Sequence, residues 1–170
     1  MMVNAQRGVG LMEVMVAALI LAVAVLGFIA LQYRSLNAAN EAYYRTQAMS
    51  VARDLAERIR ANPLAKQTYL EQLTYSAGTE TTPPATTTAC MASTCSKDQF
   101  AVADANEIKA KAQAVGMQVA METCSAVKRN CIYIAWEDTL PKEGSAEDKS
   151  CTKGGTYIDE SRCIVMEAYQ

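Results

Sequence analysis

The apolar positions of the chain form one long uninterrupted run near its start. From Val14 to Leu31, 18 consecutive residues carry no charged or strongly polar side chain. A helix of that length spans roughly 27 Å, close to the thickness of a bilayer hydrocarbon core. Glu13 sits at the front of this run, where a carboxylate is costly unless it is paired or neutralised. The run therefore predicts a membrane-spanning helix, with Glu13 as a candidate functional residue.

The helical pattern continues beyond the apolar run. Between Gln32 and Asn62 there is no Pro and no Gly, and good helix formers dominate. Pro63 ends the pattern, because the residue before a proline is disfavoured in the α region. We therefore expect one helix from about Leu11 to Ala61, whose second half covers the chain's own C-terminal domain. Apolar residues recur there at helical spacing: Tyr44, Ala48, Val51, Ala52, Leu55 and Ile59.

The middle of the chain predicts a second helix and an exposed loop. A short helical piece is expected at 65–73, and the Thr-rich stretch from Ser76 to Ala89 is interpreted as an exposed connector, with a contact or glycosylated loop as the alternative. Ser96 is a candidate N-cap for a helix from Lys97 to Val115. The residues expected on the apolar face of that helix are Phe100, Ala101, Ala105, Ile108, Ala112 and Val115.

The last third of the chain changes to strand-like patterns. Three strands are expected, at Met117–Glu122, Cys131–Glu137 and Arg162–Tyr169, with a hairpin loop from Ser125 to Asn130. The polar stretch from Thr139 to Thr156 is interpreted as a long surface connection. Together these elements predict an α+β fold, in which a small antiparallel sheet packs on the second half of the long helix.

The six cysteines all follow the apolar run, and they are Cys90, Cys95, Cys124, Cys131, Cys151 and Cys163. An even number on one side of a membrane indicates disulfides in an oxidising compartment. A metal site is disfavoured, because the chain has no His and no Cys-x-x-Cys spacing. Proximity along the chain favours the local pairs Cys90–Cys95, Cys124–Cys131 and Cys151–Cys163 among the possible connectivities.

Catalytic patterns are not found in the sequence. Without His there is no Ser-His-Asp triad, and no Gly-rich phosphate loop occurs. Glu143, Glu147 and Asp148 lie in a polar stretch that is typical of a solvated surface. The formal net charge is −2, so the chain lacks the excess of positive charge that is typical of nucleic-acid-binding proteins. We therefore expect no enzyme activity, no cofactor, no metal and no nucleic-acid partner.

The N-terminus resembles the signal of type IV pilins. In that family a short basic leader ends in Gly, a prepilin peptidase cuts after it, the new first residue is methylated, and the fifth residue is Glu. Here residues 1–8 would be the leader, with Arg7 as its charge and Gly8 before the cut. Val9 would be the methylated residue, although the family most often has an aromatic residue there. Glu13 falls at the required fifth position and would pair with the Val9 amino group of a neighbouring subunit.

The resemblance is strongest to minor pilins of the PilV type, through the stretch from Gly10 to Ala17 and the Leu-Gly-Phe-Ile-Ala-Leu-Gln sequence that ends at Gln32. It implies a role in pilus assembly or its initiation. The implied partners are the prepilin peptidase, other minor pilins, the major pilin, the inner-membrane assembly platform and the membrane itself. It divides the chain into a leader (1–8), a transmembrane and assembly half-helix (9–33), an amphipathic half-helix (34–62) and a periplasmic disulfide-rich domain (63–170).

The positive-inside rule places the N-terminus with Arg7 in the cytoplasm and the cysteines in the bacterial periplasm, with the protein first in the inner membrane and then in the pilus. Two other functions remain open: a minor pseudopilin of a type II secretion system, and a membrane-tethered periplasmic binding domain that never polymerises. An ordinary secretory signal is less consistent with the sequence, because its apolar core is shorter.

Overall fold

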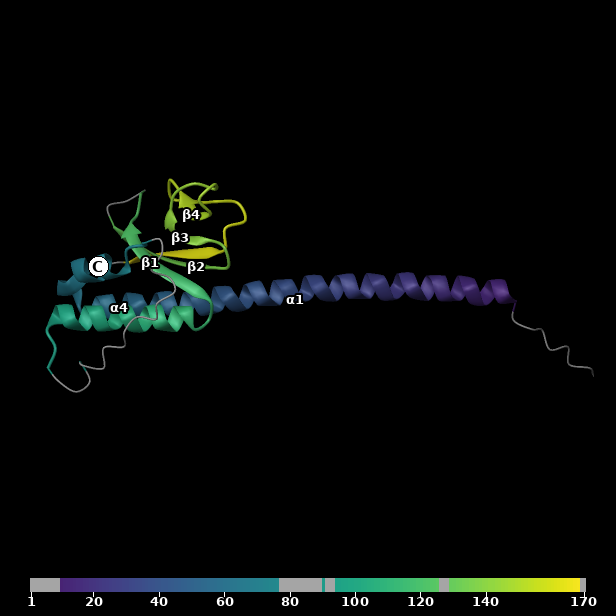
Figure 1. Ribbon diagram of the computed structural model, residues 1–170, viewed down its shortest axis with the longest axis horizontal. Coiled ribbons are helices and arrows are strands. Elements are labelled where there is room, and N and C mark those ends of the chain that lie inside the picture. Colours follow the sequence, from purple (N-terminus) through teal and green to yellow (C-terminus); the bar gives the residue numbers. More distant parts are fainter. Residues whose placement is uncertain (1–9, 77–89, 91–93, 126–128, 169–170) are drawn as a thin grey trace, which may run out of the picture. The chain divides into compact units, whose positions relative to one another are not determined.

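Helix α1 extends over Leu11–Ala61, the range predicted from the sequence. The computed structural model describes residues 10–76, 90, 94–125 and 129–168 (Figure 1). The chain forms two compact units, Met1–Ala42 and Tyr43–Gln170. The described part of the first unit is almost entirely α1, and the remainder of α1 is the first element of the second unit.

Helix α1 ends where the proline predicts. The Asn62 N–H donates to the carbonyl oxygens of Arg58 and Ile59 at 3.1 and 3.2 Å, which closes the last turn. Pro63 then opens a short 3₁₀ helix, η1 (Pro63–Ala65), and α2 (Lys66–Leu73) follows. Five positions of the expected apolar stripe are buried, namely Ala48, Val51, Ala52, Leu55 and Ile59, and Tyr44 packs at the margin of this core.

Helix α4 (Lys97–Gln113) begins at the predicted cap. Ser96 accepts from the Gln99 N–H, and the Gln99 side chain accepts in return from the Ser96 N–H, which makes a capping box. The face packed in the core consists of Ala101, Ala105, Ile108 and Ala112. The expectation for Phe100 is wrong, because this side chain is 46% exposed. Phe100 lies about 100° around the helix from Ala101, which places it outside a narrow face of small residues.

The first sheet contains β1 (Met117–Thr123), β2 (Asn130–Trp136) and β6 (Cys163–Ala168). Its order is β1-β2-β6 and both pairings are antiparallel, as predicted. Every residue of β2 is buried. Ile132, Ile134 and Trp136 belong to the core with the helices. The alternate residues Cys131, Tyr133 and Ala135 form a second core with the other cysteines of the sheets, so β2 is covered on both faces.

The stretch predicted as a surface connection instead builds a second sheet (Figure 1). It contains β3 (Leu140–Glu143), β4 (Ser150–Lys153) and β5 (Thr156–Tyr157), in that order. Strands β3 and β4 run parallel, whereas β4 and β5 run antiparallel. The prediction fails because β4 is buried through a cysteine and small hydroxyl residues, at Ser150, Cys151 and Thr152, rather than through an apolar alternation.

Candidate functional site

The first turn of α1 holds one of the three N-terminal site residues. Gly8 and Val9, the expected cleavage and methylation residues, lie outside the described residues. The Gly10 carbonyl oxygen accepts from the Glu13 N–H at 2.8 Å, so Glu13 stands where the helix dipole favours a negative charge. Glu13 is exposed, and no residue of the described chain forms an ion pair with it. Its carboxylate is therefore available to a group outside the described residues.

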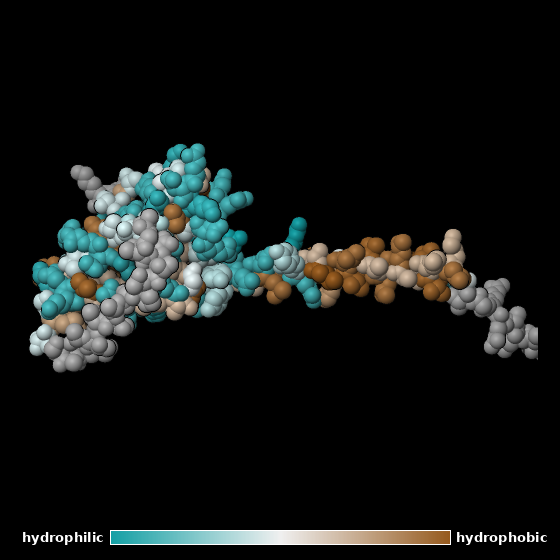
Figure 2. All heavy atoms as spheres, in the orientation of Figure 1, coloured by the Kyte–Doolittle hydropathy of each residue, from teal (hydrophilic) through white to brown (hydrophobic). Residues whose placement is uncertain are grey.

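Behind Glu13, α1 carries no charged or strongly polar side chain from Val14 to Leu31, and Figure 2 shows this stretch in brown on the face in view. Over the described residues, α1 is also the one helix long and apolar enough to cross a membrane. Its most apolar 18-residue window has a mean hydropathy of 3.0 and none of it is buried. A helix that is apolar all round requires lipid or other helices around it. This property is consistent with membrane anchoring. The large side chains that are at least 48% exposed include Leu11, Met12, Val14, Met15, Val16, Leu19, Ile20, Leu21, Val23, Val25, Leu26, Phe28, Ile29 and Leu31.

The six cysteines form three disulfides, and these are the pairs that proximity along the chain predicts: Cys90–Cys95, Cys124–Cys131 and Cys151–Cys163. The Cys90–Cys95 disulfide lies directly before Ser96, the N-cap of α4. The second closes the hairpin between β1 and β2. The third links β4 to the start of β6 and so joins the two sheets. Cys124, Cys131, Cys151 and Cys163 are all buried in the second core.

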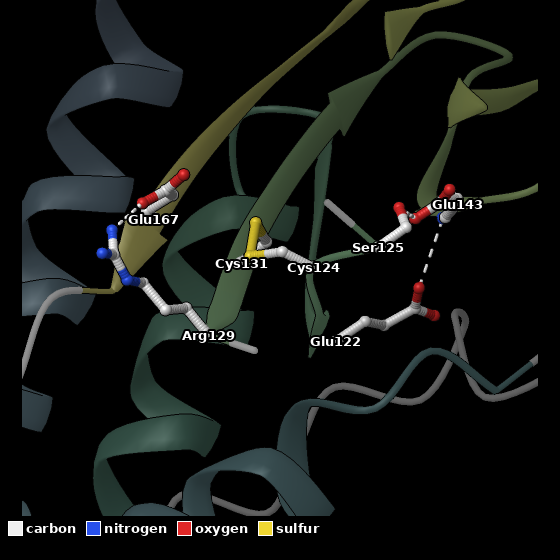
Figure 3. Close-up of a disulfide and its surroundings, with 7 residues drawn as sticks. All are labelled: Glu122, Cys124, Ser125, Arg129, Cys131, Glu143 and Glu167. Atoms are coloured by element: carbon white, nitrogen blue, oxygen red, sulfur yellow. Dashed lines mark hydrogen bonds and ion pairs between the residues drawn. A yellow bond between two sulfur atoms is a disulfide. The ribbon is translucent and has the colours of Figure 1, made fainter. Parts of the chain in front are cut away.

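Polar contacts hold the Cys124–Cys131 hairpin on both sides (Figure 3). On one side, Arg129 donates to Glu167 of β6 at 2.8 Å. On the other side, Ser125 donates to the Glu143 carboxylate of β3. The same carboxylate accepts from the Gly154 N–H at 2.7 Å, in the turn between β4 and β5. Glu143, expected as a solvated surface residue, therefore joins the hairpin to the second sheet.

A second polar cluster joins α1, α2 and α4 around Arg58. Its guanidinium donates to Asp54 at 2.9 Å, to Asp104 at 2.6 Å and to Glu107 at 2.8 Å. Tyr69 of α2 donates to the other oxygen of Asp104, at 2.6 Å. Asp54 lies four residues before Arg58 on the same helix, a spacing at which an acidic and a basic side chain can pair. The contacts with α4 join residues far apart in the chain, and no sequence pattern indicates them.

Burial and hydrogen bonding shift the pKa of three residues of this cluster, Arg58, Tyr69 and Asp54. The hydrogen bonds with Glu107 raise the pKa of Arg58 most, and those with Asp54 and Asp104 add to this against burial, which lowers it. Burial raises the pKa of Tyr69, and its bond to Asp104 raises it further. For Asp54, burial favours a higher pKa, but the bonds from Lys111 and Arg58 outweigh it and lower the pKa. At neutral pH these shifts favour a charged Arg58, a charged Asp54 and a protonated Tyr69 hydroxyl.

The described residues place no group of three or more His, Cys, Asp or Glu side chains where they could hold a metal ion. Every cysteine of the chain is in a disulfide. The arrangement offers packing surfaces and cross-links, and the distinguishing chemistry of the described residues lies in the exposed apolar run of α1 with Glu13 at its front.

Comparison with known proteins gives one match. The family model described as type IV pilin Tt1218-like matches residues 30–106, which include the second half of α1, α2 and the first part of α4. No curated protein and no solved structure matches the chain. The matched segment does not reach the leader or Glu13. Together with the long helix packed on a small antiparallel sheet, this match supports a type IV pilin-like protein.

Proposed function

We propose that the chain is a minor type IV pilin of the PilV type, cut after Gly8, methylated at Val9 and held in the inner membrane by α1 before it enters a filament. The observation that carries the proposal is the exposed apolar face of α1 with Glu13 in its first turn. A helical segment that is apolar all round and carries one carboxylate in its first turn needs apolar neighbours and one positive charge.

The proposed mechanism is helix packing. In the filament, apolar helices of many subunits replace lipid around α1. Glu13 is then surrounded by apolar side chains, and a buried carboxylate is stable only with a partner. Cleavage after Gly8 creates a free amino group at Val9, and the Val9 amino group of a neighbouring subunit supplies that partner. Processing and assembly are coupled through this pair.

The second unit, Tyr43–Gln170, holds all six cysteines, and we call it the cysteine-rich unit. In this proposal it lies in the periplasm. Its three disulfides require an oxidising compartment, which supports that orientation. The N-terminus with Arg7 then faces the cytoplasm, in accordance with the positive-inside rule. The prepilin peptidase, the inner-membrane assembly platform, the major pilin and other minor pilins are the proposed partners, with a role in initiating or joining the filament.

The test is the N-terminus of the protein extracted from membranes. Mass spectrometry should find a chain that begins with a methylated Val9. An uncut chain that stays in the membrane would favour a tethered periplasmic binding domain instead. A minor pseudopilin of a type II secretion system shares the cleavage chemistry, so a deletion strain separates these two. Loss of twitching motility supports the pilin, and loss of protein secretion supports the pseudopilin.

A further inference from the structure

A small polar cavity lies where the end of α2 meets α4, β1 and β3. Its volume is about 70 Å³ and it is open to solvent. Its eight lining residues include Lys109, Gln118 and Tyr75, and none of the eight is Asp or Glu. Pockets for small-molecule ligands usually exceed about 300 Å³. This cavity therefore has room for one functional group of a side chain rather than for a metabolite.

Lys109 is a partly buried cation with an incomplete set of partners. Its Nζ donates to the carbonyl oxygen of Gln72, in the last turn of α2, where helix carbonyls lack intrahelical donors. An ammonium group has three donors, and within the described part of the chain no carboxylate pairs with this one. Burial lowers the pKa of Lys109, with no negative charge to oppose it. A buried charge without a counter-ion is costly, so this site favours an anion.

Two more groups add to the character of the cavity. The Oε1 atom of Gln118 is buried and has no hydrogen-bond donor among the residues described. The Lys142 Nζ lies 5.5 Å from the ring centroid of Tyr75, which lines the cavity, and adds a second positive charge close to it. The cavity thus presents ammonium N–H donors of Lys109 and a positive charge, with a second cation nearby. The carboxylate of an acidic residue matches this set.

We propose that the cavity receives the carboxylate of an Asp or Glu from a neighbouring subunit, with Lys109 as its ion-pair partner. The inference rests on the proposed function, because assembly is what brings a second subunit to this surface. The occupant is an acidic side chain of an adjacent pilin subunit, and the cross-linked peptide identifies the subunit that carries it.

A zero-length cross-link tests the contact directly. A carbodiimide joins a lysine amine to a carboxylate only where the two touch, and mass spectrometry then identifies both residues. With sheared filaments and membranes as samples, Lys109 should be linked to an Asp or Glu of another subunit, and the linked peptide shows which subunit it is. A link from Lys109 to a carboxylate of its own chain, such as Glu80, would overturn the proposal, as would a lack of any Lys109 link in filaments that contain the protein.

Matched variants separate charge from packing. Lys109→Arg keeps the charge but not the reactive amine, so it should lose the cross-link and enter filaments normally. Lys109→Gln keeps a donor for the Gln72 carbonyl but removes the charge, so its amount in filaments should fall several-fold without a change in its unfolding temperature. Lys153→Gln, at an exposed lysine of β4, is the control and should have no effect. Equal filament levels for Lys109→Gln and wild type would overturn the proposal.

The outcome also separates this inference from the proposed function. If the wild-type chain is absent from filaments, the proposed function fails, and the membrane sample still decides whether Lys109 contacts another subunit. If the wild-type chain is in filaments and only the Lys109 contact is missing, the proposed function stands and this inference is wrong.

Discussion

The guanidinium of Arg58 lies 2.6 Å from the carboxylate of Asp104, although 46 residues separate them along the chain. Arg58 stands on α1 and Asp104 on α4, and both side chains are only about one quarter exposed, at 24% and 22%. At such partial burial a charge-assisted hydrogen bond contributes more than an exposed ion pair. This contact therefore fixes the position of α4 against the C-terminal end of α1.

Replacing Arg58 should destabilise the cysteine-rich unit. Arg58→Met removes the donor to Asp54, Asp104 and Glu107 and leaves their charges close together, so we expect a loss of about 2 kcal/mol in the free energy of unfolding. Chemical denaturation of the detergent-solubilised chain measures it. Arg53→Met is the control, because Arg53 is exposed on the same helix, and it should change stability by less than about 0.5 kcal/mol. Equal losses for the two variants would contradict the role assigned to Arg58.

The same cluster predicts weaker stability in acid. The pKa of Asp54 is lowered in the folded state, so its contribution is complete at neutral pH and is lost as the pH falls through that lowered value. We expect stability to decrease between about pH 5 and pH 2, and Asp54→Asn should make this decrease shallower. Asp138→Asn serves as the control, because the Asp138 side chain is 88% exposed, and it should leave the pH profile unchanged.

The helices and the first sheet could be predicted because their burial follows a period. The stripe ending at Ile59 recurs at helical spacing, and Ser96 marks the start of the second helix. The second sheet could not be predicted in this way. Cys151 is buried by a disulfide to Cys163 and by strand pairing, and neither depends on an apolar alternation. Short polar strands that rely on cross-links give no periodic signal.

The candidate sites also differ in whether a sequence pattern reveals them. Glu13 was found from the sequence because a charge next to a long apolar run is unusual. The Arg58 cluster and the Lys109 cavity were missed, because each is built by residues of different elements that meet only in the folded unit. Their members are ordinary charged residues of amphipathic helices, and a solvated helix face gives the same pattern.

Removing the hairpin disulfide should cost more than removing the one before α4. The sulfurs of Cys124 and Cys131 pack in the second core, whereas Cys90 and Cys95 are only partly buried. We expect the double Ser variant of the hairpin pair to lose about 2 kcal/mol, and that of the other pair to lose less. Thermal unfolding under non-reducing conditions compares them. A larger loss from the Cys90–Cys95 variant would show that the second core does not depend on its disulfide.

Cleavage should require Gly8. A side chain at this position would crowd the site of a prepilin peptidase, as the pilin pattern implies. We expect Gly8→Val to keep the leader, remain in the membrane and fail to enter filaments. Gly27→Ala is the matched control, since a Cβ at Gly27 meets no atom within 4 Å and α1 should stay intact. A band of mature size from Gly8→Val on a denaturing gel would refute the proposed cut.

Glu13 should matter for assembly and not for membrane insertion. Glu13→Val removes a charge from an apolar helix, so insertion should become easier, by up to about 3 kcal/mol. If Glu13 pairs with the Val9 amino group of a neighbour, the variant should be cleaved, keep its disulfides, stay in the membrane and be depleted from sheared filaments. Glu57→Gln removes an exposed carboxylate from the same helix within the cysteine-rich unit and should assemble normally. The ratio of filament to membrane protein is the measurement, and a wild-type ratio for Glu13→Val would mean that the carboxylate acts only within its own helix turn.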